Sequence, residues 1–253
     1  MSLQERIATA DGKRRYVRTL FATIADRYDF ITVALSYGQD RRWKRRLIDL
    51  AAPRPGARAL DLATGTGDLA FALAACRARV VGLDITYRMV ELANAKSAAA
   101  RDFRLGDRGP ERAAPRNTPR FLVGDMLALP FPAAAFDIVT TGYGLRNVPN
   151  LTMAIDEIGR VLVAGGQMLS LDFNRPSNGI VRAVYLAYLT TVGAALGWLL
   201  HRDPDTYRYI PASIRQYPGA DAVADMFAAR GFSRVRCYPI LGGLMTLHHA
   251  IRD

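Results

Sequence analysis

The chain has 253 residues, half of them apolar, which is enough for one sizeable α/β domain but not for two full ones. Its two cysteines, Cys76 and Cys237, are far apart and show no Cys-x-x-Cys or Cys/His spacing, so neither a disulfide framework nor a metal site is indicated. The net charge of +11 favours a polyanionic neighbour, either nucleic acid or an anionic membrane surface, although arginine-rich composition also serves solubility alone.

Two helices are expected before the first strand. Apolar residues recur at helical spacing across residues 13–29, and again across residues 41–51. The segment between them, which contains Leu35-Ser36-Tyr37-Gly38, breaks the pattern and predicts a structured loop. The N-terminal residues carry acids among their bases and no apolar run, so no secretory signal is visible and we expect a cytoplasmic protein.

The next stretch combines a buried strand, residues 57–62, with the glycine-bearing turn Thr64-Gly65-Thr66-Gly67. A turn of small residues lets a ligand lie almost against the backbone. The spacing is neither the dinucleotide fingerprint nor a phosphate loop. Asp61, at the end of the strand, places a negative charge beside the turn, which suits a cationic ligand.

Asp84 ends the following apolar run, at the position where an acid of a doubly wound sheet hydrogen-bonds a ribose diol. The turn and this acid together predict a pocket for S-adenosylmethionine (SAM). The amino-acid end of SAM would lie over the turn, and its ribose on Asp84. A dinucleotide or flavin-type nucleotide on the same architecture is the alternative.

Strands and helices then alternate. Strands are expected at residues 57–62, 79–85, 121–124, 136–141 and 167–172, and helices at residues 71–76, 87–100 and 151–163. The polar, Gly- and Pro-rich residues 101–119 predict a surface loop. Repeated β-α units predict an α/β, Rossmann-like fold with a mostly parallel sheet and helices on both faces. Together with the predicted SAM pocket, this corresponds to the fold of the class I SAM-dependent methyltransferases.

Residues 180–200 form the most apolar stretch and approach the length of a membrane span. A helix at residues 220–231 and strands at 234–241 and 245–251 follow, and the same sheet needs these strands for completion. We therefore expect a helix beside the active-site mouth that offers an apolar wall and dips into the lipid interface; an ordinary buried helix is the alternative. The prediction is a single methyltransferase domain, 1–253, with N-terminal helices at 13–51 and an apolar helical cap segment at about 176–216.

Several motifs carry a specific resemblance. They read Leu35-Ser36-x-Gly38-x-x-Arg41-x-Trp43-Lys44, Asp61-Leu62-Ala63-x-Gly65-Thr66-Gly67-Asp68, Leu129-Pro130-Phe131 and Tyr143-Gly144-Leu145-Arg146-Asn147-Val148. In this order, and with the tail motif Gly242-Gly243-x-x-x-Leu247-His248, the chain resembles the ubiquinone/menaquinone biosynthesis C-methyltransferases over nearly its whole length. The glycine turn alone is common to SAM-dependent enzymes of this fold, whereas the motif with Arg146 is specific.

The resemblance implies SAM contacts at the turn threonine, at the acid after the second strand, at the pair after the third strand and at the end of the fourth. The cofactor-binding residues expected are Asp61, Gly65, Thr66, Gly67, Asp84, Asp125, Met126 and Gly142. Asp125 can accept from the adenine amino group, and Met126 can pack on the ring. The chain departs from the family at Thr64, commonly glycine, and at Gly142, commonly serine.

The resemblance also implies catalytic roles for Arg146 and Asn147. Carbon methylation of a phenol needs alignment with the sulfonium methyl, loss of the phenolic proton and stabilisation of the phenolate. Arginine stays protonated at physiological pH, so we expect Arg146 and Asn147 to stabilise the phenolate. The proton would leave through water towards Asp61 or His248.

The predicted activity is SAM-dependent methylation of a ring carbon of a polyprenylated demethylquinol, with demethylmenaquinol ahead of the ubiquinone-pathway benzoquinol. We expect the protein to associate peripherally with the inner face of the cell membrane. It would act as a homodimer or in a quinone-pathway complex, and nucleic acid is not an expected partner. The alternatives are methylation of another lipophilic small molecule, a non-catalytic membrane-associated scaffold and, on charge alone, an RNA methyltransferase.

Overall fold

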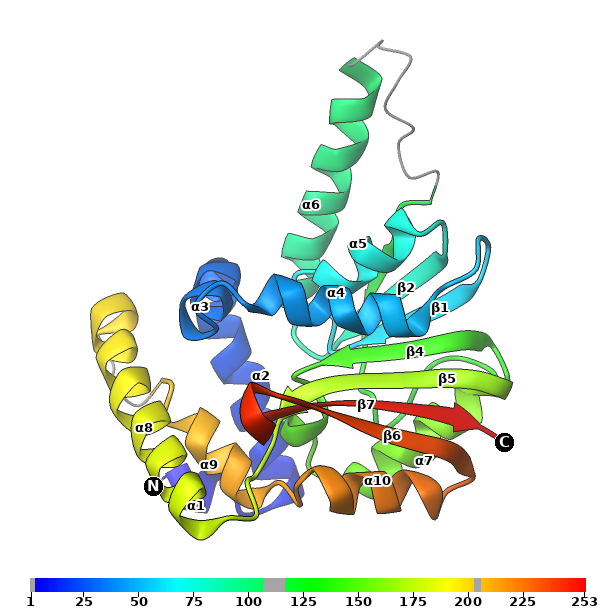
Figure 1. Ribbon diagram of the computed structural model, residues 1–253. Helices are drawn as coiled ribbons and strands as arrows, with labels where there is room; N and C mark the ends of the chain where they lie inside the picture. Colours follow the sequence, from blue (N-terminus) through cyan, green and yellow to red (C-terminus); the bar gives the residue numbers. More distant parts are fainter. Residues whose placement is uncertain (1–2, 107–116, 203–205) are drawn as a thin grey trace.

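A seven-stranded sheet organises the protein, in the order β3-β2-β1-β4-β5-β7-β6 (Figure 1). The computed structural model describes residues 3–106, 117–202 and 206–253. The strands are β1 Arg58–Leu62, β2 Arg79–Asp84, β3 Arg120–Val123, β4 Phe136–Gly142, β5 Leu162–Phe173, β6 Phe232–Ile240 and β7 Met245–Arg252. Strands β1 to β5 pair in parallel, and β7 runs antiparallel between β5 and β6. The mostly parallel Rossmann-like sheet confirms the predicted fold class.

Helices cover both faces of this sheet because successive strand residues point to opposite sides. On β1, Ala59 packs with residues of α4 (Asp40–Ala51) and α5 (Asp68–Ala75). Its neighbour Leu60 packs with residues of α7 (Leu151–Val161) and α10 (Ala220–Ala228). The long helix α6 (Tyr87–Gly106) contacts β2 and β3. The two apolar layers fix the carboxyl ends of the parallel strands, where ligands bind in such sheets.

Further helices gather at one end of the sheet, on the left of Figure 1. They are α1 (Leu3–Arg6), α2 (Ala10–Ile24), α3 (Tyr28–Leu35), α8 (Gly179–His201) and α9 (Tyr209–Gln216), with the 3-10 turns η1 (Ala25–Arg27), η2 (Leu145–Asn147) and η3 (Leu241–Gly243). Thr9 begins α2 by accepting from the Gly12 N–H, and Asn178 begins α8 by accepting from the N–H groups of Ile180 and Val181. These helices cover the end of the sheet at which the parallel strands finish (Figure 1).

Three local predictions are wrong in detail. The helix expected at residues 13–29 ends at Ile24, and Tyr28–Leu35 forms α3 where a loop was expected. Packing explains α3, since Ile31 is buried with Ile24 and Tyr207, a residue far away in sequence. Helix α6 continues to Gly106, so the first part of the expected 101–119 loop is helical, and residues 107–116 lie outside the described residues. Helix α9 lies within the helical cap predicted at about residues 176–216, for which no separate bounds were predicted.

Helix α8 is the apolar segment of residues 180–200. Among the described helices it alone is long and apolar enough to cross a membrane, by length and composition. Only 24% of its most apolar part is buried inside the protein. After α8 the chain returns to the sheet, where β7 pairs with β5 along seven positions from Gln167↔Ile251 to Phe173↔Met245. The strands expected after the apolar segment therefore complete the same sheet, as predicted.

Candidate active site

A narrow cleft lies where β1, β2 and β4 end. Its main cavity has a volume of about 70 Å³ and is lined by Gly65, Asp84, Asp125, Met126, Gly142 and Asn147, among others. A smaller cavity of about 20 Å³ over the glycine turn is lined by Asp61, Thr66 and Gly142, among others. The structure thus brings together all but one of the expected cofactor-binding residues, the exception being Gly67.

Asp84 anchors the glycine turn. Its buried carboxylate accepts from the Gly65 N–H at 2.9 Å and from the Thr86 N–H at 2.8 Å. Burial raises the pKa of Asp84, and these two hydrogen bonds oppose the rise. Gly65 has φ of +55°, a conformation that a residue with a Cβ adopts only under strain. Each oxygen of Asp84 keeps a lone pair, so the acid can still accept from a ribose diol.

Asp61 is the second buried acid of the cleft. Its oxygens accept from the Thr64 hydroxyl at 2.7 Å and from the Thr140 hydroxyl at 2.8 Å. Burial raises its pKa to about 6, against the lowering effect of both hydroxyls. Among the described residues no Lys, Arg or His forms a salt bridge with Asp61, and such a buried carboxylate suits the ammonium of an amino acid.

Of the other expected cofactor residues, Asp125 and Thr66 line the cleft, whereas Gly67 lies outside it. Asp125 accepts from the Leu127 N–H at 2.9 Å and pairs with Arg14 at 3.1 Å. The Thr66 hydroxyl donates to Asp29 at 2.5 Å. Gly67 has φ of +95° and lines neither cavity; a Cβ there would lie 2.8 Å from the Phe121 ring, so glycine is needed for packing.

Helix α2 covers the cofactor cleft. Arg14, Val17 and Phe21 line the main cavity from above. The helix is held by the Arg14–Asp125 pair and by Lys13, whose ammonium donates to the Arg146 carbonyl at 3.0 Å. Burial and the nearby guanidinium of Arg146 lower the pKa of Lys13 to about 8. Cavities that hold a drug-sized ligand measure about 300 Å³ or more, so this cavity has to widen to admit SAM, and we expect α2, which lines it, to be the element that moves.

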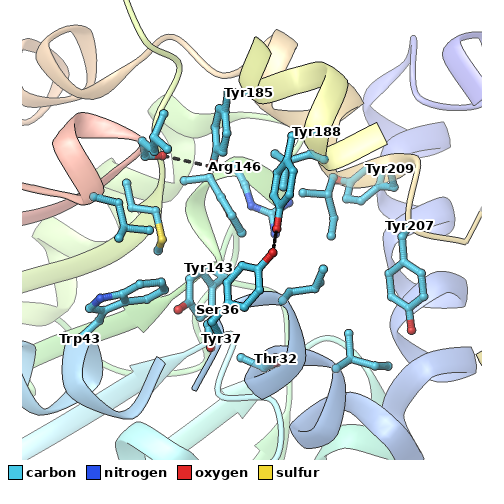
Figure 2. A pocket seen from close by; sticks show the side chains of 18 of the residues that line it. Thr32, Ser36, Tyr37, Trp43, Tyr143, Arg146, Tyr185, Tyr188, Tyr207 and Tyr209 are labelled. Carbon is cyan, nitrogen blue, oxygen red and sulfur yellow. Dashed lines mark hydrogen bonds between the residues drawn. The ribbon is translucent and has the colours of Figure 1, made fainter. Parts of the chain in front are cut away.

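A second, much larger cavity of about 730 Å³ lies between α2, α3 and α8 (Figure 2). Its lining is mainly apolar and aromatic, including Ile24, Ile31, Trp43, Phe173, Val184, Tyr185, Tyr188, Leu189, Tyr207 and Tyr209. Tyr37 and Tyr188 are hydrogen-bonded to each other through their hydroxyls. Tyr28 and Tyr143 line this cavity and both cofactor cavities, so their rings form the partition between them.

Arg146 reaches into this apolar cavity among the tyrosines of Figure 2. Its side chain is 5% exposed and pairs with Asp172 at 3.0 Å. It also donates to the Ser213 hydroxyl at 2.8 Å and lies 5.0 Å from the centre of the Phe173 ring. A guanidinium held by several partners is a fixed cation in an apolar wall.

Asp172 and Ser213 were missed by sequence reasoning. Asp172 is fully buried, accepts from the backbone N–H of Arg146 at 3.2 Å, and has its pKa raised by burial despite the guanidinium. The signal for it was an acid at the carboxyl end of an apolar strand, as for Asp61 and Asp84. Ser213 lies on α9, which has no signal of this kind.

Asn147 lies on the cofactor side of the same turn. It lines the main cofactor cavity, its amide donates to the Tyr143 carbonyl at 2.8 Å, and its side-chain oxygen accepts from Arg146 at 3.1 Å. The predicted catalytic pair therefore spans the partition, with Arg146 facing the apolar cavity and Asn147 facing the cofactor.

The two proton acceptors expected from the sequence lie elsewhere. His248 is buried in β7, where its Nε2 donates to the Ala220 carbonyl at 2.9 Å, and it lines none of the cavities described here. Burial lowers its pKa. Asp61 lines only the cavity over the glycine turn. Neither residue borders the apolar cavity, whereas Asp172 contacts Arg146 directly.

The residues of the cleft fit SAM chemically. Asp61 offers a carboxylate to an ammonium, Asp84 offers an acceptor to a diol, and Met126 offers an apolar side chain to a ring. Among the residues the structure describes, no group of His, Cys, Asp and Glu is placed to hold a metal ion.

The solved structures similar to this chain include SAM-dependent methyltransferases. One from Thermotoga maritima aligns with a TM-score of 0.64 and 15% identity, covering 94% of this chain and 100% of its own. A phosphoethanolamine N-methyltransferase from Haemonchus contortus, solved with SAM, aligns with a TM-score of 0.59 and 13% identity over 84% of this chain and 52% of its own. At this identity the likeness shows the shared fold.

Sequence relatives are closer. A demethylmenaquinone methyltransferase of Thermus thermophilus is 42% identical over 90% of this chain and 98% of its own length. A ubiquinone/menaquinone biosynthesis C-methyltransferase of Azotobacter vinelandii is 37% identical over 95% of this chain and 91% of its own. The model of the ubiE/COQ5 methyltransferase family matches residues 9–252. The fold and these matches together show that the chain is a SAM-dependent methyltransferase and belongs to the ubiE/COQ5 methyltransferase family.

Proposed function

We propose that the protein transfers the methyl group of SAM to a ring carbon of a polyprenylated demethylquinol, with demethylmenaquinol as the first candidate acceptor. The observation that carries the proposal is the apolar cavity of about 730 Å³, which shares the Tyr28–Tyr143 partition with the cofactor cleft. An apolar cavity of this size suits a prenylated ring. Arg146 supplies the positive charge that would stabilise a phenolate.

The acceptor assignment also draws on the relatives. The Thermus relative is named for demethylmenaquinone, and the Azotobacter relative for both quinone pathways. A naphthoquinol and a benzoquinol share the reactive phenol and the prenyl tail, so the benzoquinol is the second acceptor to test.

In the proposed mechanism, bound SAM supplies a methyl group on an electrophilic sulfonium. Asp61, Gly65 and Thr66 would hold its amino-acid end, Asp84 would hold the ribose, and Asp125 with Met126 would hold the adenine. Gly142 lets the cofactor approach the end of β4, and Gly67 shapes the turn. Tyr28 and Tyr143 separate the two ligands except where the methyl passes.

Arg146 and Asn147 would do the electrostatic part of the chemistry. As the phenolic proton leaves through water, the fixed guanidinium stabilises the oxygen anion that makes the ortho carbon nucleophilic. Arg146 is not the base, because guanidinium stays protonated at physiological pH. Asn147 holds the turn through Tyr143 and Arg146, so the cation stays aligned with the methyl group.

Peripheral membrane association at the inner face of the cell membrane is the second part of the proposal. Near the apolar cavity, α8 exposes Ile180, Val184 and Trp198, each at least 65% exposed, and η3 exposes Leu241. The exposed arginines of α4, Arg41, Arg42, Arg45 and Arg46, can meet anionic head groups at about 1 kcal/mol per residue. Such a surface would let a prenyl tail pass from the bilayer into the cavity.

The decisive experiment uses purified protein, SAM and each of the two quinols in detergent. We expect a product 14 mass units heavier, about one CH₂, with SAM binding measured on the same sample. SAM binding without turnover of either quinol would favour the scaffold, and no SAM binding by folded protein would refute the proposal.

Flotation with anionic vesicles, beside a nucleic-acid gel shift at physiological salt, tests the surface. Salt-resistant RNA binding without vesicle association would instead support an RNA methyltransferase. Resistance to carbonate extraction would show an integral protein and contradict peripheral binding.

A further inference from the structure

Tyr143 has an unusual backbone. It follows β4 directly, between Gly142 and Gly144, and has φ of +62°. For a bulky residue this left-handed conformation is a genuine outlier, and such residues persist only where the surroundings hold them. Its ring stands in the partition between the apolar cavity and the cofactor cleft. The residue with the strained backbone therefore stands between the two cavities.

Three hydrogen bonds hold Tyr143 in this conformation. Its N–H donates to the Leu171 carbonyl at 2.7 Å, and its carbonyl accepts from Asn147 at 2.8 Å. Its hydroxyl donates to Asp40 at 2.6 Å. The first two fix only the backbone, so the direction of the ring depends on Asp40 and on packing against Phe173, 5.7 Å between ring centres.

Asp40 is itself fixed by charge. It is 2% exposed at the start of α4, and its other carboxylate oxygen lies 2.7 Å from the Lys44 ammonium, one helical turn later. Lys44 also pairs with Asp68 at 2.8 Å and lies 5.9 Å from the centre of the Tyr143 ring. Because Asp40 is ion-paired in a buried position, it is a strong acceptor for the Tyr143 hydroxyl.

We propose that Asp40 is a positioning residue for methyl transfer: through the Tyr143 hydroxyl it holds the ring that aligns the acceptor carbon with the methyl group of SAM. The assignment rests on the proposed function and adds to it a residue of α4 outside both cofactor cavities and outside the apolar cavity. Lys44 supports Asp40 by holding its carboxylate in place through their ion pair. Tyr143 remains a hydroxyl donor throughout, because burial and the facing carboxylate raise its pKa.

The alignment of two reactants is sensitive to small displacements. A ring released from Asp40 can turn within the large apolar cavity, which widens the range of acceptor orientations. The acceptor would still bind, since the cavity keeps its apolar lining. The loss should therefore appear in the rate of transfer and not in the binding of either ligand.

The test is a double-mutant cycle with Tyr143→Phe and Asp40→Ala, measured as the single-turnover rate of methyl transfer to demethylmenaquinol. We expect each change to lower the rate about tenfold, as for loss of a charge-assisted hydrogen bond. The double variant should be no slower than the slower single variant, because both changes remove one interaction. The Kd for SAM and the melting temperature are measured on every variant.

Asp40→Asn provides a rescue, because the amide oxygen can still accept from Tyr143, and its rate should exceed that of Asp40→Ala. Asp49→Asn is the matched control, an exposed carboxylate on the same helix, and should keep the wild-type rate. If Asp40→Ala does not fold, Tyr143→Phe and Asp40→Asn still decide the question.

Losses of transfer rate that simply add up in the double variant would overturn the assignment. So would a Tyr143→Phe rate near that of the wild type, or a loss of rate that weaker SAM binding explains. Wild-type protein that binds SAM but methylates neither quinol would refute the proposed function, and this assignment with it. Wild-type turnover with unaffected variants would refute the assignment alone.

Discussion

At the scale of single residues, Arg146 matters because its charge is buried in an apolar wall. Asp172 and Ser213 hold its guanidinium, so two of its edges are occupied and the remaining donors are fixed in direction. A planar fork held in this way can face a developing anion without rearranging, which is the condition for efficient electrostatic stabilisation.

Replacing Arg146 with Lys should therefore lower turnover by ~10²-fold or more, as for removal of an oxyanion donor. A lysine ammonium cannot reach Asp172, Ser213 and the acceptor at the same time. The measurement is kcat together with the Kd for SAM, which should barely change. Near-normal turnover, or a joint loss of SAM binding and folding, would mean that Arg146 only supports the structure.

The raised pKa of Asp61 predicts that the stability of the folded protein depends on pH. Burial raises its pKa to about 6 from the usual 3.8, so across that window the folded protein keeps a proton that the unfolded chain has released. Its contribution to stability therefore falls as pH rises from about 4 to about 6 and is constant above.

Binding of SAM should show the opposite trend, because the ammonium of SAM needs the ionised carboxylate. We expect the Kd to fall between about pH 5 and pH 7 and then to level off. Calorimetric titration at several pH values measures this, and Asp61→Asn should abolish the dependence. A wild-type Kd that is flat over this range would place the ammonium elsewhere.

At the scale of elements, α2 stands between solvent and the cofactor cleft. The cavity beneath it, about 70 Å³, is too small for SAM, so we expect the helix to move outwards and to close again on the ligand. The Arg14–Asp125 pair and the Lys13 hydrogen bond described above tie its first turns to the cleft.

Hydrogen exchange should therefore be fast in α2 without ligand and slower with SAM bound. Helix α7, buried against the sheet, is the internal reference and should not change. Arg14→Gln should speed exchange in the free protein. Identical exchange in α2 with and without SAM would show that the cofactor enters by another path.

Helix α8 exposes apolar side chains, and one of them is a natural reporter. Trp198 is 67% exposed, whereas Trp43, the other tryptophan, is 8% exposed. Anionic vesicles should shift the fluorescence to shorter wavelength, because an interfacial tryptophan leaves water. Trp198→Phe should remove the shift. An unchanged spectrum in a protein that floats with vesicles would place the contact away from this end of α8.

At the scale of the whole molecule, one sheet contains strands from both the first and the last part of the chain. Strand β7 lies between β5 and β6, so residues after the apolar helix complete the sheet begun before it. Phe227, Phe232 and Leu247 are almost completely buried in its core. The prediction of one domain follows from this dependence.

A chain that ends at residue 178 should accordingly fail to fold. It would expose the β5 edge and the apolar surface under α10, both of which favour aggregation. Soluble yield and cooperative unfolding, compared with the full chain, measure the effect. A soluble fragment with a cooperative transition would show that the sheet is stable without its last two strands.

Much of this architecture is determined by local sequence. The strands and most helices follow from apolar periodicity, and the turn with Gly65, the acid Asp84 and the motif with Arg146 follow strands directly. Parallel strands bring such positions to one edge of the sheet, so the cofactor cleft could be predicted before its geometry was known.

The tertiary structure alone decided the partners of these residues. Residues 28–35 are helical because Ile31 packs on Tyr207, Arg146 is fixed by Asp172 and Ser213, and Tyr143 is held by Asp40. Each of these contacts joins segments distant in the chain. A periodic pattern reports only which face of an element is buried, whereas the side chain that meets it there is chosen by the packing of the whole fold.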